Sequence, residues 1–453
     1  MRVSATQAYL DARSRLGIKF GLETMRALVL ALGHPERSFA SLLVAGTNGK
    51  GSVAAYVDAA LGAAGLRSGR YTSPHLVRVH ERITVAGEEI SGAALAAAVR
   101  RVRRAADVLV AEGALARHPT HFEVLTAAAF EHFRRRRVEV AVLEVGLGGR
   151  LDATNVVLPL ASAIVSVDFD HQEFLGHSLA AIAGEKAGVL RAERTTVVGP
   201  LPDEARAAIE QHALETGARL AFAREETRVV AREGALDLET PCGRYRGLRP
   251  LPGAYQRDNL LVAVRLLEEG KRAGLAVTLD GLADGIGATR WPGRLERIEG
   301  TPPLILDGAH NLAAARALAA EMSAHRPFVL LFGTMADKDV AAITETLFPL
   351  ADGLVLTAPE VERAASPAEV MVRAREWALG ARLEPDVRKA LAAARRLAGP
   401  NRPVLVAGSL YLVGAVKALL DKERRLSLGS FASRARSARM IRQRAIKAPL
   451  KVQ

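Results

Sequence analysis

The chain has 453 residues, of which 49% are hydrophobic and 25% are charged, and its formal net charge at pH 7 is +13. This length is too great for a single hydrophobic core, so the composition predicts a globular protein of two or three domains. No apolar run reaches the roughly 18–20 residues that span a bilayer, residues 1–20 lack a signal-peptide core, and the single cysteine excludes an internal disulfide. We therefore expect a cytoplasmic protein that does not bind a membrane.

The glycine-rich segment GTNGKGS at residues 46–52 follows a predicted strand at 42–45 and precedes a predicted helix at 52–61. The backbone N–H groups of such a turn can surround a phosphate, and its glycines let the chain approach a ligand closely. Lys50 adds a positive charge for the outer phosphates, and the Ser52 hydroxyl suits phosphate or Mg²⁺. One glycine separates the lysine from the serine, so the spacing departs from the usual G-x-x-x-x-G-K-[ST] pattern. The segment predicts a nucleotide phosphate site rather than an ordinary turn.

The first two-thirds of the chain alternates apolar, β-rich runs with alanine-rich helical stretches. Strands are predicted at 138–145 and 161–167, and helices at 94–111 and 124–133. This alternation predicts an α/β fold with a mainly parallel sheet and helices on both faces. Such sheets bind ligands at the carboxyl ends of their strands, where the glycine-rich segment and Glu144 both fall.

Three ionisable residues follow at strand or helix ends. Glu144 closes an apolar strand, and Mg²⁺ beside nucleotide phosphates is a natural partner for such a carboxylate. His171 ends the DFDH segment, and Lys186 lies between small residues at the end of an apolar helix. Each also has a structural alternative: a surface glutamate, a hydrogen-bonded histidine, or a lysine beside a helix dipole. Their occurrence together favours a nucleotide and metal site.

A second alternating unit begins near residues 291–294, with strands predicted at 304–306, 328–332, 353–356 and 404–406. We place an N-terminal domain at 1–292 and a smaller C-terminal α/β domain at 293–420. The remaining residues, 421–453, hold ten Lys or Arg and two acidic residues. They form a basic tail, predicted to be disordered or a loose helix, that carries most of the excess charge.

Ten short segments occur in the order of one known family. They are GTNGKGS (46–52), TSPHL (72–76), THFE (120–123), LEVGLGGRLDATN (143–155), DHQEFLG (170–176), EKAG (185–188), WPGRLE (291–296), LDGAHN (306–311), FGTMADKD (332–339) and GSLYLVG (408–414). Together they resemble folylpolyglutamate synthase, including its bifunctional dihydrofolate synthase form, within the Mur ligase superfamily. The resemblance covers roughly residues 8–420. It implies a P-loop ATP-binding N-terminal domain of the Mur ligase central type, which also binds folate, and a C-terminal domain of the Mur ligase C-terminal type.

The resemblance also implies roles for matched residues. ATP would bind to Gly49, Lys50, Gly51, Ser52, Asn259, Arg294, Asp307 and His310. Mg²⁺ would bind to Ser73, Glu144 and His171, and the catalytic residues would be Lys50, Lys186 and His171, with Lys186 matching a lysine that is carbamylated in the family. The pteroate group would bind to Lys19, Phe20, Gly21, Leu22, Thr120, His121, Phe122, Glu123, Leu151, Asp152 and Ala153. One departure is Tyr255, because the family often has histidine before the glutamine that is Gln256 here.

The expected function is ATP-dependent addition of L-glutamate to dihydropteroate, to tetrahydrofolate-type reduced folates, or to both, through an acyl phosphate. The expected protein is a monomer. A cell-wall Mur ligase that joins an amino acid to a UDP-linked muropeptide is the nearest alternative, but TSPHL, THFE and LDGAHN resemble the folate enzymes. A nucleic-acid-associated ATPase that uses the basic tail is a third class. We expect no nucleic-acid partner, because Phe431 is the single aromatic residue of the tail and base stacking needs more.

Overall fold

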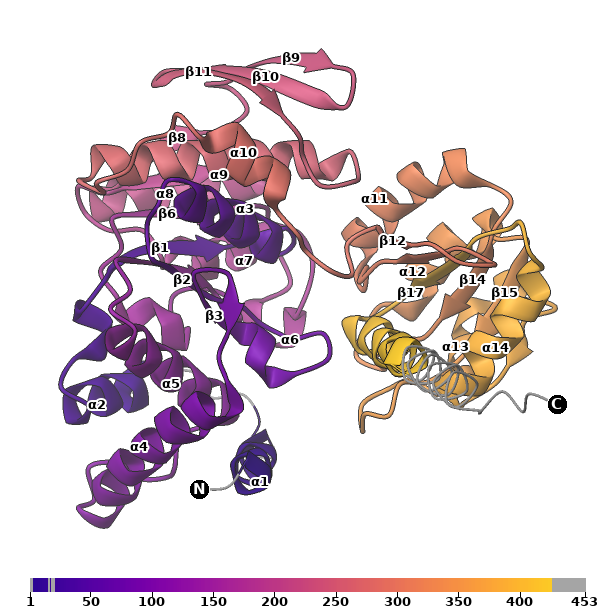
Figure 1. The fold of residues 1–453 in the computed structure, drawn as a ribbon, viewed down its shortest axis with the longest axis horizontal. Coiled ribbons are helices and arrows are strands. Elements are labelled where there is room, and N and C mark those ends of the chain that lie inside the picture. Colours follow the sequence, from indigo (N-terminus) through magenta and orange to yellow (C-terminus); the bar gives the residue numbers. More distant parts are fainter. Residues whose placement is uncertain (1–2, 15–16, 18–20, 426–453) are drawn as a thin grey trace, which may run out of the picture. The chain divides into compact units, whose positions relative to one another are not determined.

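The computed structural model describes residues 3–14, 17 and 21–425 (Figure 1). Two compact units share this chain. The first unit is Met1–Glu296 together with Asn311–Ala324, and the second is Arg297–His310 together with His325–Gln453. Each unit contains its own sheet, so each is described separately below.

The first unit is built on an eight-stranded sheet with the order β4-β3-β2-β5-β1-β6-β7-β8. The six strands from β2 to β8 in this order are parallel, and β3 and β4 join one edge as antiparallel strands. The bounds are β1 Ala40–Ala45, β2 Ser68–Tyr71, β3 Ile83–Val85, β4 Glu88–Glu89, β5 Val140–Glu144, β6 Ala161–Ile164, β7 Thr195–Val198 and β8 Arg219–Phe222. The predicted α/β fold and its mainly parallel sheet are confirmed, and the strands expected at 138–145 and 161–167 are β5 and β6.

Both faces of this sheet are covered by helices because the central strands are apolar on both sides. In β1, Leu43 and Ala45 pack into one core cluster, whereas Leu42 and Val44 pack into the other, as the two-residue period of a strand requires. The second cluster holds α3 (Lys50–Ala63), α9 (Tyr255–Arg272) and α10 (Leu282–Ala288). The first cluster holds the main helices of the opposite face: α1 Val3–Ser14, α2 Glu23–Ala31, α4 Gly92–Ala111, α5 His121–Arg135, α7 Leu179–Ala187 and α8 Asp203–Thr216.

Shorter helices join these elements. They are η1 Pro35–Arg37, η2 Val79–Arg82, η3 Ala153–Val156 and α6 Gln172–Leu175. The helices predicted at 52–61, 94–111 and 124–133 are therefore α3, α4 and α5, each of which begins a few residues earlier than expected.

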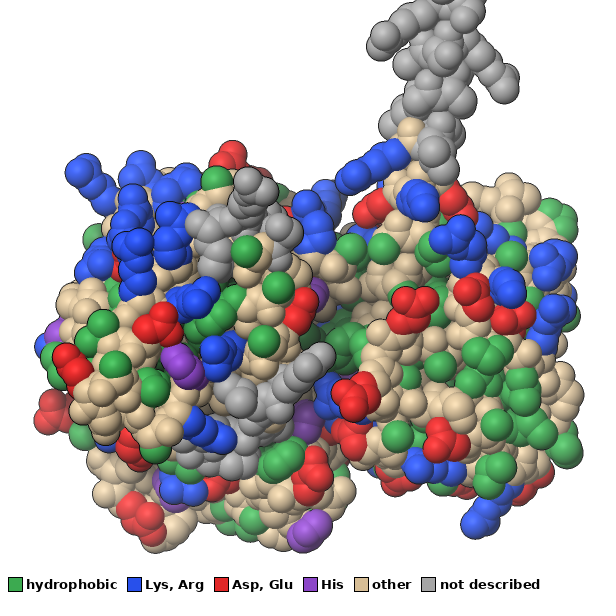
Figure 2. Space-filling view, turned by 90° about the horizontal axis from the view of Figure 1, so that it is seen from below, with side chains coloured by type: hydrophobic (Ala, Val, Ile, Leu, Met, Phe, Trp, Pro, Cys, Tyr) green, Lys and Arg blue, Asp and Glu red, His purple; other side chains and the backbone are tan. Residues whose placement is uncertain are grey.

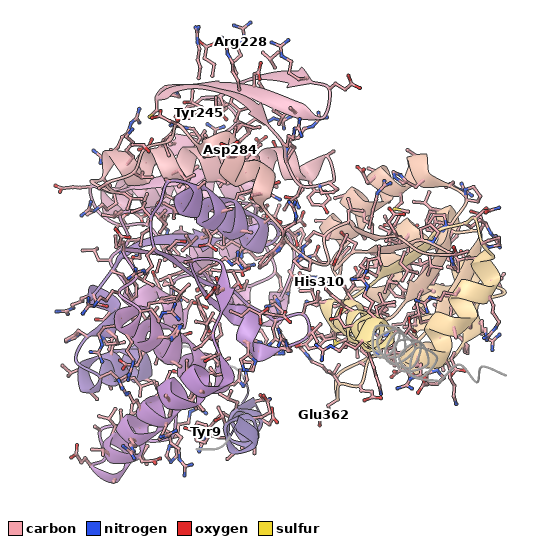
Figure 3. All side chains as sticks on the ribbon, in the orientation of Figure 1. Tyr9, Arg228, Tyr245, Asp284, His310 and Glu362 are labelled. Carbon is pink, nitrogen blue, oxygen red and sulfur yellow. The ribbon has the colours of Figure 1, made fainter. Side chains whose placement is uncertain are left out.

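A three-stranded antiparallel sheet, absent from the predicted elements, lies beside α9 and α10 (Figure 1). Its strands are β9 Arg228–Arg232, β10 Ala235–Thr240 and β11 Gly243–Leu248. Leu236 and Leu238 face the core, and Tyr245 points from β11 towards the helices, where its hydroxyl donates a 2.8 Å hydrogen bond to Glu268 of α9 (Figure 3). Arg228 points to solvent, and the exposed Cys242 lies in the turn between β10 and β11.

The second unit contains a six-stranded sheet with the order β12-β13-β17-β14-β15-β16. The bounds are β12 Glu296–Ile298, β13 Leu304–Leu306, β14 Val329–Phe332, β15 Gly353–Leu356, β16 Arg382–Leu383 and β17 Val404–Ala407. The strands from β13 to β16 in this order are parallel, so the second α/β unit is confirmed. All four strands predicted for it are present, as β13, β14, β15 and β17.

The helices of the C-terminal third of the chain are α12 Val340–Leu347, α13 Pro367–Ala374, α14 Val387–Ala398, the short η4 Ser323–His325, η5 Phe348–Leu350 and η6 Arg375–Ala378, and a helix at residues 410–425. Helix α11, Leu312–Met322, groups with the first unit. Of the predicted basic tail, residues 421–425 are helical and residues 426–453 lie outside the described residues. Charged side chains of both signs lie on each unit on the face that Figure 2 shows. No helix of the described chain has the length and apolarity that a membrane crossing needs.

Candidate functional site

The glycine-rich loop connects the carboxyl end of β1 to the first turn of α3. Gly46 and Gly49 have φ values of +149° and +83°, conformations that favour glycine. Ser166, just beyond β6, holds the loop: its hydroxyl accepts a 2.9 Å hydrogen bond from the N–H of Asn48 and donates a 3.0 Å bond to the Asn48 carbonyl. Thr47 is fixed in the same way, because its N–H donates to the Ser166 carbonyl at 2.8 Å. The free N–H groups of the first turn of α3 are thereby placed at the sheet edge, where they can bind an anion.

Lys50, the first residue of α3, folds back over this loop. Its Nζ atom donates hydrogen bonds of 2.9 Å to the carbonyl of Gly46 and 3.0 Å to that of Thr47. Burial lowers the pKa of Lys50, while the carboxylates of Glu144, Asp170 and Asp152 oppose that shift. The amine is therefore held by two backbone carbonyls and is influenced by three carboxylates, and its contact with phosphate stays a prediction.

Glu144 ends β5 directly beside Val44 of β1 and is buried, with 5% of its surface exposed. Its Oε2 atom accepts a 3.0 Å hydrogen bond from the N–H of Ser73, so two predicted metal ligands are brought together. Burial raises the pKa of Glu144, and Lys50 is the largest opposing influence. A buried carboxylate in this position suits a divalent cation that also binds phosphate and water.

His171, the third predicted metal ligand, precedes α6 with a φ of +50°, and its Nε2 atom lies 3.9 Å from the Asp170 carboxylate. Among the described residues, no three His, Cys, Asp or Glu side chains lie close enough to hold a metal ion by themselves. The pairing of Ser73 with Glu144 is thus observed, and the part of His171 stays a prediction.

Lys186 lies near the end of α7 with 3% of its surface exposed. Burial, with a smaller contribution from the charge of Lys50, lowers the pKa of Lys186 to about 7, and Asp170 opposes this shift. Within the described ranges, no hydrogen bond or ion pair joins the Lys186 Nζ atom to another residue. The lysine is therefore a buried amine that is partly neutral at physiological pH, close enough to Lys50 for their charges to interact.

The segment 120–123 begins α5 and faces a second loop, at residues 145–149, which follows β5. Thr120 and Glu123 form a capping box, in which Glu123 accepts hydrogen bonds from the N–H and hydroxyl of Thr120. Phe122 covers Gly146 so closely that a Cβ there would lie 2.5 Å from the ring. Thr120 and Glu123 therefore cap the N-terminus of α5, and the Phe122 ring contacts the 145–149 loop.

His121 contacts the N-terminal helix: its Nδ1 atom lies 3.0 Å from the Leu10 carbonyl and 3.1 Å from the Ser14 hydroxyl. Burial lowers the pKa of His121, which favours the neutral imidazole. The N-terminal helix and the start of α5 are therefore tied together beside the same loop.

The predicted segment 151–153 folds against the same loop. Asp152 accepts hydrogen bonds of 3.0 Å from the N–H groups of both Gly146 and Leu147, and its other oxygen accepts from Thr154. Leu151 is half-buried, and Ala153 starts η3. Of the other predicted pteroate residues, Gly21 has a φ of +126°, Leu22 is buried, and Lys19 and Phe20 lie outside the described residues. The structure thus brings 120–123 and 151–153 together around one loop.

The start of α9 lies against the glycine-rich loop at residues 46–52. Asn259 lies over Gly49, in the space that a Cβ at Gly49 would occupy. Its amide donates a 3.0 Å hydrogen bond to Gln256, whose own amide donates to the Ser52 hydroxyl at 3.2 Å. Gln256 thus links two predicted ATP-binding residues, although Tyr255 replaces the histidine that the family often has before it.

Arg294 belongs to the first unit, and its charge lowers the pKa of both Lys50 and Glu144, which places its guanidinium near them. Asp307 and His310 belong to the second unit. Asp307 accepts a 2.8 Å hydrogen bond from the N–H of Ala309, and His310 contacts the Gly308 carbonyl at 2.8 Å. The charge of Arg294 thus acts on the lysine of the loop, and the nucleotide contacts of Arg294, Asp307 and His310 stay predictions.

Three polar residues at this edge are not among the predicted site residues. Asn48 and Asn311, both in the first unit, exchange amide hydrogen bonds of 3.2 and 3.1 Å, and Asn311 also donates to Asp170 at 3.0 Å. All three lie inside the GTNGKGS, DHQEFLG and LDGAHN segments. Their motifs were therefore visible in the sequence, whereas their mutual contact was not.

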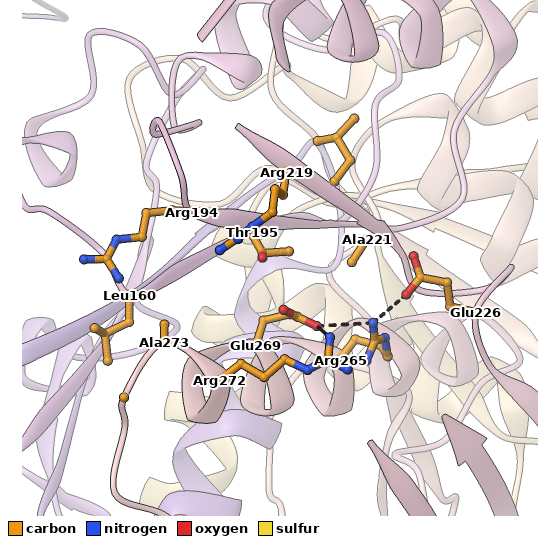
Figure 4. Close-up of a pocket in the computed structure, with 12 residues that line it drawn as sticks. Leu160, Arg194, Thr195, Arg219, Ala221, Glu226, Arg265, Glu269, Arg272 and Ala273 are labelled. Atoms are coloured by element: carbon orange, nitrogen blue, oxygen red, sulfur yellow. Dashed lines mark hydrogen bonds and ion pairs between the residues drawn. The ribbon is translucent and has the colours of Figure 1, made fainter. Parts of the chain in front are cut away.

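A separate cavity of about 750 Å³ lies at the amino ends of β6, β7 and β8, the edge opposite to the glycine-rich loop (Figure 4). Arg194, Arg219 and the buried Arg265 line it with Glu226 and Glu269. None of the predicted site residues lines this cavity, so it does not bear on the predicted chemistry.

Comparison with known proteins shows the family of the chain. Residues 293–410 match the family described as Mur ligase, glutamate ligase domain. The folylpolyglutamate synthase of Lacticaseibacillus casei is 35% identical, over 93% of this chain and 99% of the relative.

Two solved structures superimpose closely. E. coli FolC in complex with DHPP and ADP has a TM-score of 0.83, with 31% identity over 94% of this chain and 99% of that one. A bifunctional folylpolyglutamate synthase/dihydrofolate synthase with Mn, AMPPNP and L-glutamate bound has a TM-score of 0.81, with 31% identity over 93% and 98%. The chain therefore belongs to the folylpolyglutamate synthase/dihydrofolate synthase family of the Mur ligase superfamily.

Proposed function

We propose that this protein is an ATP-dependent ligase that adds L-glutamate to dihydropteroate, to tetrahydrofolate and its polyglutamates, or to both. The observation that carries the proposal is the convergence of Lys50, Glu144 and Arg294 beside a glycine-rich loop at the carboxyl edge of a parallel sheet. The relatives support it, because solved family members hold ADP with DHPP, or AMPPNP with Mn and L-glutamate. The muropeptide ligases are related only at the level of the superfamily.

The reaction joins a carboxylate to an amine in two steps. An oxygen of the folate carboxylate attacks the γ-phosphorus of ATP, the bond from that phosphorus to the β–γ bridging oxygen breaks, and ADP leaves. The amine of glutamate then attacks the acyl carbon, and the tetrahedral intermediate expels phosphate while the nitrogen loses a proton. Lys50 and Arg294 balance the negative charge on the transferring group, so catalysis consists mainly of positioning and electrostatic stabilisation.

A divalent cation, Mg²⁺, is part of the proposal, with Ser73, Glu144 and His171 as the residues that would hold it. The buried Glu144 carboxylate fits this role, since burial raises the pKa of Glu144 and a bound cation would favour its ionised form. When bound, the ion would neutralise phosphate charge during transfer. Glu144 and the N–H of Ser73 orient one another without it.

Lys186 is proposed to be carbamylated. A neutral lysine amine can attack CO₂, forming an N–C bond and releasing one proton, and the lowered pKa of about 7 makes the neutral amine available at physiological pH. The product is an anion, which the adjacent charge of Lys50 would stabilise. Carbamylation would thereby convert the buried amine of Lys186 into an anionic carbamate.

The remaining assignments follow the family. We propose that ATP binds to residues 49–52, Asn259, Arg294, Asp307 and His310, and that the pteroate group binds beside 19–22, 120–123 and 151–153. The proposed domains are 1–292, for ATP and folate, and 293–420, with 421–453 as an appended tail. The proposed state is a cytoplasmic monomer.

One assay tests the function. The purified protein, ATP, Mg²⁺ and glutamate would be offered dihydropteroate, tetrahydrofolate and a UDP-muropeptide in separate reactions, with products identified by mass spectrometry. We expect ADP release coupled to a mass gain of one glutamyl residue on one or both pterin substrates. Amide formation only on the UDP-muropeptide, or no amide from any acceptor, would refute the proposal.

A further inference from the structure

The indole of Trp291 packs directly on the glycine-rich loop. A Cβ placed on Gly51 would lie 2.5 Å from Cζ2 and 3.0 Å from Cε2 of the Trp291 ring. Any side chain at position 51 would therefore displace the ring. The absence of a Cβ at Gly51 thus serves a contact inside the protein, besides the approach of a phosphate.

The same indole is covered by a cation. The guanidinium carbon of Arg70, in β2, lies 5.1 Å from the centre of the Trp291 ring. Arg70 is held by the buried Asp58 of α3 at 3.2 Å, and Asp58 also accepts a hydrogen bond from the Ser68 hydroxyl at 2.5 Å. Trp291 therefore contacts two groups that belong to fixed elements, the first turn of α3 and the strand β2.

Arg70 also acts on the catalytic edge. Its charge is one of the influences that oppose the raised pKa of Glu144, so the guanidinium lies near that carboxylate. The Nε atom of Arg70 is buried and has no hydrogen-bond partner among the described residues. A single arginine thus connects the indole, helix α3 and the electrostatics of Glu144.

A second anchor lies four residues beyond Trp291. Leu295, with 4% of its surface exposed and a φ of +46°, fills the space that a Cβ at Gly253 would occupy. Between the two anchors, the N–H of Gly293 donates a 2.9 Å hydrogen bond to Glu296. Arg294 therefore stands in a segment fixed at both ends, and its charge acts on Lys50 and Glu144.

We propose that Trp291 and Arg70 are positioning residues of the nucleotide site: their stack on Gly51 sets the shape of the phosphate loop and the location of Arg294, and it senses the nucleotide. This inference rests on the proposed function, because it takes the loop to bind ATP. It predicts that loss of the stack weakens nucleotide binding more than it slows amide formation at saturating ATP, and that the emission of Trp291 changes when nucleotide binds.

The two tryptophans of the chain make a direct test possible. Trp377 lies in η6 of the second unit. All variants carry Trp377→Phe, so that all tryptophan emission comes from Trp291. ADP, and then AMPPNP with Mg²⁺, is titrated while the emission is recorded. We expect a saturable change, and we expect Arg70→Met to diminish it. Arg206→Met is the matched control, because Arg206 covers the Phe222 ring at 4.0 Å, on α8 and away from the glycine-rich loop.

Calorimetry supplies the second measurement. Trp291→Ala is expected to weaken ADP binding by about tenfold, equivalent to roughly 1.4 kcal/mol, and Trp291→Phe to recover most of the affinity. In steady-state assays, KM for ATP should rise while kcat changes little. Circular dichroism verifies folding of each variant, and the Arg70→Met emission result stands even if Trp291→Ala does not fold.

The outcomes separate this inference from the proposed function. Calorimetric binding of ADP to the wild-type protein without any change in Trp291 emission, together with normal affinity in Arg70→Met, would overturn the inference alone. Failure of the wild-type protein to bind ADP would overturn both.

Discussion

The backbone N–H of Ser73 donates a 3.0 Å hydrogen bond to the Oε2 atom of Glu144. Ser73 follows β2, and Glu144 ends the neighbouring parallel strand β5, in which Leu143 pairs with Tyr71 of β2. The register of the sheet therefore determines the orientation of the carboxylate, since one of its oxygens is bound to the backbone and the other remains available. This geometry makes Glu144 the most directly testable residue of the site.

Glu144→Gln is expected to reduce kcat by about 10²-fold or more, because a neutral amide cannot supply the charge that a divalent cation needs. The fold should be retained, since the amide oxygen still accepts from Ser73 and the cost of burying a charge disappears. Steady-state kinetics over a range of Mg²⁺ concentrations provides the measurement. Glu139→Gln, an exposed carboxylate just before the same strand, is the control and should leave the kinetics unchanged.

The lowered pKa of Lys186 predicts a pH dependence of stability. The folded-state pKa is about 7 and the unfolded value is 10.5, so between these values the unfolded chain binds more protons than the folded one. The free energy of unfolding contributed by Lys186 should therefore rise from pH 7 towards pH 10.5 and stay at its unfavourable minimum below pH 7. Urea denaturation of the wild type and Lys186→Met in CO₂-free buffer checks this. Parallel pH profiles for the two proteins would contradict it.

Arg265 predicts a large stability effect outside the catalytic edge. It is 1% exposed and forms ion pairs with Glu226 at 2.5 Å and with Glu269 at 3.3 Å (Figure 4). It also forms an ion pair with Glu268. Arg265→Met would remove the cation that pairs with the buried Glu268, whereas Glu269 keeps its ion pair with Arg272 at 2.8 Å. The substitution should cost about 3–5 kcal/mol of unfolding free energy. Arg228→Met, at an exposed arginine of β9, should cost less than about 0.5 kcal/mol. Equal urea midpoints for the two variants would show that the buried cluster contributes nothing.

Two glycines of α3 offer a matched pair. Gly51→Ala places a Cβ against the Trp291 ring, whereas a Cβ at Gly62 meets nothing within 4 Å. We expect Gly51→Ala to weaken ADP binding, and Gly62→Ala to leave binding unchanged while raising stability by roughly 0.5–1 kcal/mol through helix propensity. Calorimetry with ADP and thermal unfolding measure the two effects. Unimpaired binding by Gly51→Ala would argue that the ring can move without consequence.

Much of this architecture could be predicted from local patterns. The apolar run before GTNGKGS and the helix after it are β1 and α3, and Glu144 indeed stands at a strand end. The sheet β9–β11 could not be predicted in the same way, because β9 is exposed and its alternation is obscured by Arg228 and Arg232. Its stability comes from distant contacts, such as that of Tyr245 with Glu268.

Contacts between distant residues were equally hidden. Trp291 lies in the WPGRLE segment, but no local pattern indicates that its ring rests on Gly51, 240 positions earlier. Asp152 was predicted to bind substrate, yet it accepts hydrogen bonds from Gly146, Leu147 and Thr154, which gives it a structural part that spacing alone does not reveal. Pairwise packing of this kind depends on the folded sheet and not on neighbouring residues.

Cys242 is the single thiol of the chain and is exposed in the turn between β10 and β11. A maleimide dye would therefore attach at one known position, without prior removal of other cysteines. If a second cysteine were introduced on the surface of the second unit, a donor–acceptor pair could report the separation of the two units during turnover. The protein is thus already prepared for single-molecule measurements by its own composition.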